Sequence, residues 1–241
     1  AAGPAGNAAP GTAGCRRARR AGPATMGAMR ARPISPAALV EELADRIAAL
    51  DGRPWLRVAI DGAPAARPGE LADALVDPLR VRGRPVARIS TEDFLRPASL
   101  RFEHGREDPS AYYEDWLDES GLRREVLDPL EPEGGTGRIL PSLWDAAADR
   151  ATRAPYITVP RGGVVLVDGT LLLGRWLPFE FTVHLWLSPG ALRRRTPPQW
   201  HWTLPAYRRY ETEADPAGTA GLVVRTDDPR HPALVEPDRP S

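Results

Sequence analysis

The chain has 241 residues, enough for one α/β domain with a sizeable core, and its 32 basic residues balance its 32 acidic ones. All the basic residues are arginine, because the sequence contains no lysine. The first 32 residues hold six arginines and no acid, so acidic residues exceed basic ones in the remainder. An acidic body of this kind argues against a surface that binds nucleic acid.

The number of cysteines and the hydropathy of the chain argue against a disulfide-stabilised, a membrane-spanning or a secreted protein. The single cysteine, Cys15, rules out an internal disulfide or a cysteine-rich zinc site, and it favours a reducing, cytoplasmic location. No apolar run approaches the roughly 18 residues of a membrane span, so we expect no membrane partner. The opening "AAGPAGNAAPGTAGC" has too few leucine, valine and isoleucine residues for a signal peptide.

Residues 1–34 are predicted to be a disordered tail, because they are mainly Ala, Gly, Pro and Arg and have almost nothing to bury. One interpretation is a basic arm that binds nucleic acid. The interpretation that we favour is different: the segment before the only two methionines, Met26 and Met29, is upstream sequence translated from a wrong start. Residues 35–241 are then expected to form the folded domain.

The first helix is predicted over "ISPAALVEELADRIAAL", residues 34–50, where Ser35 can act as N-cap and Pro36 suits the first helical position. After the strand "WLRVAI", a second helix is predicted from about Gly69 to Arg82, with a kink at its internal proline. Apolar residues recur at helical spacing along both segments.

Continuous apolar runs predict further strands at residues 85–90, 162–169, 181–188 and 220–226. Such strands, separated by helical stretches, favour an α/β fold whose parallel sheet has helices on both faces. Ligands of such sheets bind at the carboxyl ends of the strands. The residues at three of these ends are Asp61 and Gly62, Asp93, and Asp168 and Gly169. The segment from Glu103 to Tyr156 is predicted to be a helical insertion over that crevice.

The stretch "RVAIDGAPAARPGELADAL", residues 57–75, has the strand, loop and helix context of the phosphate-binding pattern G-x-x-x-x-G-K-[ST]. Only Gly62 of the pattern is retained, whereas Arg67, Pro68 and Gly69 replace the second glycine, the lysine and the hydroxyl residue. Glu70 follows in the first turn of the helix, where a carboxylate favours the positive end of the helix dipole. We therefore predict that the loop keeps its fold but no longer binds the triphosphate of a nucleotide.

The chain resembles the uridine kinase family of P-loop nucleoside kinases over roughly residues 36–235. The motifs that carry the resemblance are "DFLRP", "DPSAYYEDWLD", "VLDPL", "LPSLWDAAADRA", "VVLVDGTLLL", "VHLWLSPGALRRRT" and "DPAGTAGLVVRTDDPRHP". The family implies a P-loop NTPase-type sheet with a helical nucleoside-binding insertion and a lid. It also implies transfer of the γ-phosphoryl group of ATP, with Mg²⁺, to the 5′-hydroxyl of uridine or cytidine.

The resemblance also implies roles for individual residues. Asp93 matches the aspartate that accepts the hydroxyl proton, and Asp168 matches the acid that organises Mg²⁺. The nucleoside-binding insertion contains Asp108, Tyr112 and Tyr113, and the lid contains Arg193, Arg194 and Arg195. A small-molecule nucleoside or nucleotide is the expected partner.

Three functions remain open on the sequence alone. They are a nucleoside kinase impaired by its loop, a non-catalytic sensor or partner protein that binds a nucleoside or nucleotide, and a purely structural component of a complex. Tyr112 and Tyr113 can belong to the core as readily as to a pocket, and Asp93 and Asp168 can be turn residues. His184 lies inside an apolar strand and does not indicate a metal site.

Overall fold

A seven-stranded sheet forms the centre of the protein in a computed structural model that describes residues 30–236. The strand order is β1-β11-β10-β9-β2-β8-β3. The strands are β1 (Arg30–Pro33), β2 (Trp55–Gly62), β3 (Val86–Ser90), β8 (Gly163–Gly169), β9 (Phe181–Trp186), β10 (Leu222–Arg225) and β11 (Ala233–Glu236). The five strands from β10 to β3 are parallel to their neighbours, whereas β11 runs antiparallel to both β10 and β1.

The parallel sheet predicted from the apolar runs is confirmed, with all five predicted strands present. β2 is two residues longer than predicted, because Asp61 and Gly62 stay in register with β9 and are buried. Every residue of β2 is buried, as expected of a central strand with both faces covered. The polar residues at the strand end therefore lie inside the protein rather than on a surface loop.

The predicted tail boundary at residue 34 is wrong for residues 30–33, which form β1 and pair with β11. Arg32 on this strand also makes two hydrogen bonds of 2.7 and 2.8 Å to the Glu42 carboxylate. Residues 1–29 lie outside the described part of the chain. The strand escaped prediction because four residues at a sheet edge carry no periodic signal of their own.

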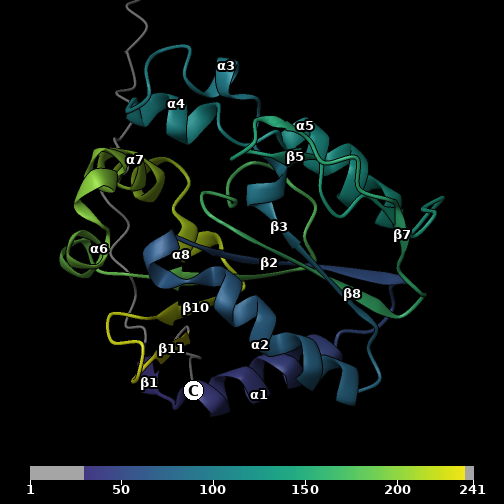
Figure 1. The fold of residues 1–241 in the computed structure, drawn as a ribbon. Helices are drawn as coiled ribbons and strands as arrows, with labels where there is room; N and C mark the ends of the chain where they lie inside the picture. The colour runs from purple at the N-terminus through teal and green to yellow at the C-terminus, as the bar shows by residue number, and fades with distance from the viewer. Residues whose placement is uncertain (1–29, 237–241) are drawn as a thin grey trace, which may run out of the picture.

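Helices α1 (Pro36–Ala48) and α2 (Pro68–Val81) cover one face of the sheet (Figure 1). The predicted N-cap of α1 is confirmed, since the Ser35 hydroxyl accepts a hydrogen bond of 3.2 Å from the Ala38 amide. α2 begins one residue earlier than predicted, at its proline, and stays a single helix through Pro78. The leucines of both helices pack against β2, β8 and β9 in one core cluster.

The other face is covered by α4 (Pro109–Glu114), α5 (Glu119–Leu122) and α7 (Leu204–Glu213), as Figure 1 shows. The remaining α-helices within residues 30–236 are α3 (Ala98–Arg101), α6 (Pro189–Arg195) and α8 (Pro216–Thr219). Helices on both faces confirm the predicted α/β class. None of the helices that the structure describes has the length and apolar composition of a membrane span.

The predicted helical insertion is only half helical. Two short antiparallel pairs follow α5, namely β4 (Arg138–Ile139) with β7 (Ile157–Thr158) and β5 (Trp144–Asp145) with β6 (Arg150–Ala151). Glycines and prolines are frequent between residues 129 and 141, which disfavours a helix there. A β-hairpin, not a helix, therefore packs next to the end of β3.

Two N-terminal deletions should separate the tail from the folded edge of the sheet. Deleting residues 1–28 is expected to leave the melting temperature unchanged, because this segment has few apolar groups to bury. Deleting residues 1–33 removes β1 and the Arg32–Glu42 pair, and should lower the melting temperature by roughly 2 to 8 °C. Calorimetry on both variants checks this, and a loss of stability in the shorter deletion would contradict it.

Candidate active-site crevice

The loop between β2 and α2 has a well-defined backbone conformation. A single 3₁₀ turn, η1 (Pro64–Ala66), follows β2, and Arg67 then has a left-handed backbone conformation with φ of 60°. Glycine normally occupies this conformation, and a side chain in it costs roughly 1 to 2 kcal/mol. The second glycine position of the pattern is therefore still glycine-like in its backbone, although an arginine fills it.

The amides of this loop are mostly not available to an anion. The Ala66 and Arg67 amides donate to carbonyl groups within the loop at 2.7 and 3.0 Å. Pro64 and Pro68 have no N–H to offer. The Arg67 side chain lies on the outside, where its guanidinium is 3.2 Å from Glu70, so the predicted carboxylate in the first turn pairs with the loop itself.

Arg88 on β3 contacts the first turns of α2, which was not predicted from the sequence. Its Nε and Nη2 atoms donate to the two carboxylate oxygens of Asp168 at 2.8 and 3.1 Å. Its Nη1 atom lies 3.2 Å from the carboxylate of Asp73 on α2. A Cβ atom on Gly69 would lie 2.8 Å from Arg88 Nη2 and 3.2 Å from an Asp168 oxygen. Gly69, which stands at the hydroxyl position of the pattern, therefore lies against the Arg88–Asp168 ion pair.

The residues present do not fit Mg²⁺ with a bound triphosphate. The hydroxyl residue that would bind the metal is Gly69, the sequence has no lysine, and both oxygens of Asp168 accept hydrogen bonds from Arg88. Burial raises the pKa of Asp168, and Arg88 acts in the opposite direction. Within residues 30–236, no three His, Cys, Asp or Glu side chains are grouped so that they could hold a metal ion.

Asp61 at the end of β2 is fully buried and has a structural role. Its carboxylate accepts hydrogen bonds from the Leu172 amide at 2.9 Å and from the Tyr210 hydroxyl at 3.0 Å, and it lies 2.6 Å from His184 Nδ1. Burial and the Asp61 charge raise the pKa of Tyr210. The network joins β2, β9, α7 and the segment after β8, and so holds the floor of the crevice together.

Asp93 lies on the 3₁₀ turn η2 (Thr91–Phe94), directly after β3. One of its carboxylate oxygens accepts a hydrogen bond of 3.0 Å from Ser142 Oγ, and its carbonyl accepts one from the Leu143 amide. The β5–β6 hairpin thus holds Asp93 in place. Since β3 and β8 are adjacent, the structure brings Asp93 and Asp168 to the same edge of the sheet.

The three residues assigned to the nucleoside have structural partners in the insertion. Asp108 caps α4 through a 2.7 Å hydrogen bond from the Ala111 amide. Tyr112 is buried, and its hydroxyl lies 2.9 Å from the hydroxyl of Tyr207. Tyr113 is partly buried, with the Arg209 guanidinium 4.7 Å from the centre of its ring. Both tyrosine side chains belong to packed layers.

The lid arginines lie on α6, which contacts the loop at η1. Arg193 and Arg194 are exposed and make no ion pair within the described residues. Arg195 is partly buried, and its Nη1 atom donates to the Thr226 carbonyl at 2.6 Å. Burial, with a smaller contribution from Arg67, lowers the pKa of Arg195. The structure thus anchors one of the three predicted lid residues beside the loop and leaves two in solvent.

A groove of about 300 Å³ lies between the α3–α4 region and the 3₁₀ turn η5 (Pro198–Thr203). Its aromatic walls are Phe102, Trp116, Trp200 and Trp202. We call it the tryptophan groove. Tyr112 lies behind it, with edge contacts to the Trp116 and Trp202 rings at 4.9 and 5.5 Å between ring centres.

Arg101 gives the tryptophan groove a buried cation. Only 5% of this residue is exposed, and its nearest carboxylate, on Asp149, is 4.0 Å away. The guanidinium donates to the carbonyls of Arg96 and Ala146 at 2.7 and 3.3 Å. Burial lowers the pKa of Arg101. The guanidinium lies 4.9 Å from the centre of the Phe102 ring and 5.3 Å from that of the Trp116 ring, so it packs against two of the aromatic walls.

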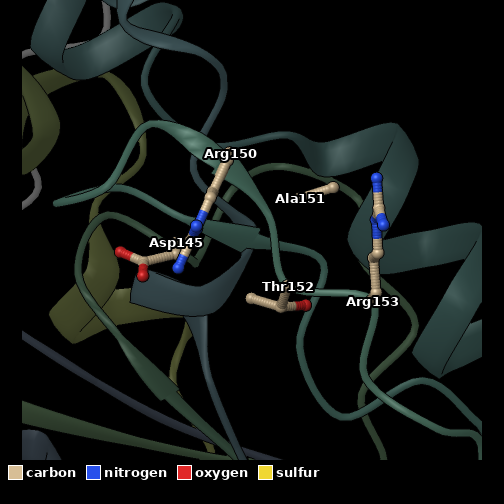
Figure 2. Close-up of a pocket in the computed structure, with 5 residues that line it drawn as sticks. All are labelled: Asp145, Arg150, Ala151, Thr152 and Arg153. Atoms are coloured by element: carbon tan, nitrogen blue, oxygen red, sulfur yellow. The ribbon is translucent and has the colours of Figure 1, made fainter.

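A second, larger hollow of about 530 Å³ lies along the β5–β6 hairpin. Figure 2 shows Asp145 and Arg150 on one side of it and Arg153 on the other. Thr152 between them donates to the Ser142 carbonyl at 2.7 Å, and Ser142 in turn contacts Asp93. This hollow is polar and lies against the segment that supports Asp93.

Sequence reasoning missed Arg88 and Arg101. The one available signal for Arg88 was a lone arginine inside the predicted strand "PVARIS", next to a strand that ends in Asp168. Arg101 carried no signal, because it lies on a four-residue helix without periodicity. The structure also places Trp200 and Trp202 on the groove wall.

Several solved structures have a fold similar to that of this chain. A possible uridine kinase from Bacillus stearothermophilus is 20% identical, with a TM-score of 0.62 over 76% of this chain and 96% of that chain. A protein assigned as a fructose transport system kinase from Silicibacter sp. TM1040 is 23% identical, with a TM-score of 0.54 over 76% and 91% of the two chains. The YGR205w protein is 12% identical, with a TM-score of 0.57 over 84% and 99%.

No protein-family model matches the sequence, and comparison with curated proteins finds no match. The first two of the likenesses to solved structures each cover 76% of this chain. The chain therefore has the fold of the P-loop kinases.

Proposed function

We propose that this protein binds a nucleoside or a related planar small molecule, and that transfer of phosphate from MgATP is strongly reduced in it. The observation that carries the proposal is the tryptophan groove, in which buried Arg101 lies beside an aromatic wall. The uridine kinase resemblance supports a pyrimidine nucleoside as the ligand and the cytoplasm as the location. The protein would then act as a nucleoside sensor or partner protein with a kinase fold.

The nucleoside end of the site keeps suitable chemistry, unlike the triphosphate end. A nucleoside needs an aromatic surface for its base and acceptors for its hydroxyls, and it needs no phosphate-binding loop. Trp116 and Trp202 offer the surface, with Tyr112 packed behind them. We assign the hydroxyl acceptor to Asp93, as the uridine kinase resemblance implies, and Ser142 holds its carboxylate by a hydrogen bond.

Calorimetry with uridine and cytidine tests this directly. We expect binding in the high micromolar to millimolar range, worth roughly 4 to 6 kcal/mol, with ATP and Mg²⁺ bound more weakly. Tight binding of ATP without any nucleoside would contradict the proposal and favour a working kinase. If no nucleoside or nucleotide raises the melting temperature, the chain is a structural component instead.

Replacing Trp200 by alanine should weaken nucleoside binding about 5- to 150-fold, because stacking of a base on an aromatic ring is worth roughly 1 to 3 kcal/mol. Trp200 is 41% exposed, so its removal should leave the fold intact. Trp176 is the matched control, since it is 92% exposed and does not line the groove. Equal affinity in Trp200→Ala and Trp176→Ala would place the ligand elsewhere.

Replacing Asp93 by alanine should weaken nucleoside binding by about 1 to 3 kcal/mol, because a ligand hydroxyl loses its acceptor. Calorimetry on the parent and the variant measures the change. Asp115→Ala serves as a control for the loss of a partly exposed carboxylate on the same insertion. If Asp93→Ala binds nucleoside as well as the parent does, Asp93 is only a support for the hairpin.

A further inference from the structure

Three nitrogen atoms of the Arg88 guanidinium face two carboxylates, one on β8 and one on α2. Asp168 takes two of the donors in a bidentate pair, and Asp73 lies near the third. The Asp168 side chain is 6% exposed, and that of Arg88 is 32% exposed. A bidentate pair between an arginine and a largely buried carboxylate is rigid and resists exchange with solvent. This guanidinium is therefore a fixed part of the crevice.

The position of Arg88 coincides with the chemistry that the loop has lost. Asp168 lies near the end of β8, on the side of the parallel strands where ligands of such sheets bind, and Gly69 stands at the hydroxyl position of the motif pattern. A Cβ atom on Gly69 would lie within 3.2 Å of both Arg88 Nη2 and an Asp168 oxygen, so a side chain there would push the end of Arg88 away from its partner. The absence of a side chain at Gly69 is therefore compatible with the Arg88–Asp168 pair.

We propose that Arg88 is a built-in replacement for the metal ion, and that it keeps Asp168 and the start of α2 closed to divalent cations. A ligand of this crevice is then bound without a metal. The inference concerns the loop end of the site, and it does not depend on which molecule the tryptophan groove takes. It requires that a side chain on Gly69 would collide with Arg88, which makes the two residues a matched pair. It also requires that both carboxylate oxygens of Asp168 are engaged by Arg88.

A double-mutant cycle in thermal stability tests the matched pair. Gly69→Ser should lower the melting temperature of the parent by roughly 2 to 8 °C, although serine is normally better than glycine in a helix. In an Arg88→Ala background the same change should be neutral or stabilising, because the obstacle is gone. Equal effects of Gly69→Ser in the two backgrounds would overturn the proposal.

The control for this cycle is Gly190→Ser. Gly190 follows the first proline of α6, just as Gly69 follows the first proline of α2. A Cβ atom there would meet only the end of the Arg194 side chain, at 3.3 Å. Gly190→Ser should therefore change the melting temperature by the same small amount with or without Arg88. A change of sign at Gly69 then comes from the collision with Arg88 and not from the helix propensity of serine.

Binding of Mn²⁺, followed by electron paramagnetic resonance on purified protein, tests the closure to metals. The parent should bind Mn²⁺ no more tightly than its Asp168→Asn variant does. Arg88→Ala should bind it at least about tenfold more tightly than the parent, and Arg88→Ala with Asp168→Asn should lose that gain. Arg80→Ala removes the same charge from an exposed pair on α2 and should show no gain.

Two results would overturn the proposal. One is Mn²⁺ binding to the parent that disappears in Asp168→Asn, which would show that the metal displaces Arg88 unaided. The other is Mn²⁺ binding to Arg88→Ala that is no tighter than binding to Arg80→Ala. If Arg88→Ala does not fold, Arg88→Gln replaces it in both experiments, and the comparison of the parent with Asp168→Asn stands without either variant.

Discussion

Purified protein is expected to phosphorylate uridine or cytidine from MgATP at least about 10⁴-fold more slowly than an ordinary kinase, which turns over about 1 to 100 times per second. Loss of one preorganised donor costs roughly 3 to 4 kcal/mol of transition-state stabilisation. Here the lysine and the hydroxyl are both absent, at Pro68 and Gly69, and the Ala66 and Arg67 amides bond within the loop. Two such losses account for the expected rate.

A radiometric assay at saturating uridine and MgATP measures this rate, and Asp93→Asn serves as its control. The residual rate of the parent should be close to that of the variant, since little catalysis remains to be removed. A turnover near one per second that vanishes in Asp93→Asn would contradict the expectation. It would show that the crevice rearranges and supplies the missing charge from one of its arginines.

Replacing Asp61 by alanine is expected to destabilise the fold by about 3 to 5 kcal/mol. The change leaves the Leu172 amide, the Tyr210 hydroxyl and the His184 ring without their buried acceptor, and each unsatisfied group costs roughly 1 to 3 kcal/mol. Urea unfolding measures the difference in free energy. Asp61→Asn should cost less, because its amide oxygen can still accept one of these hydrogen bonds.

The control for Asp61 is Asp77→Ala. Asp77 is 87% exposed and pairs with Arg80 on the surface of α2, so its loss should change the free energy of unfolding by less than about 1 kcal/mol. If Asp61→Ala were equally mild, the three hydrogen bonds around Asp61 would not hold the floor of the crevice. The loop would then depend on packing alone.

The central sheet was predictable because each of its parallel strands is a continuous apolar run, as in "GGVVLVDG". β1 and β11 were not, since each is four residues long and is stabilised by the other. The β5–β6 hairpin was missed for the same reason, because two-residue strands depend on contacts with neighbouring segments. The local pattern of apolar residues thus predicts strands that are long and buried. It does not predict short strands whose stability depends on a partner far away in the sequence.

The site was predictable where a motif position decides it. The replacements at Arg67, Pro68 and Gly69 are visible in the sequence, and so is the pair of acids at two adjacent strand ends. The sequence did not show that Arg88 lies where the loop has lost its lysine and hydroxyl, because Arg88 and its partner Asp168 are 80 positions apart in the chain. The roles of Asp108 and Tyr112 also depend on packing, which residue type alone does not decide.

The pairing of β1 with β11 affects when this protein can finish folding during synthesis. Residues 30–33 are made early, yet within the described residues 30–236 the strand that they pair with is formed by residues 233–236. Until the ribosome has released that partner, β1 is an exposed strand with unpaired amides and carbonyls, and such an edge can pair with other chains. Closing so long a loop is also slow. Aggregation during expression should therefore begin at this edge of the sheet, and faster release of the C-terminal segment should reduce it.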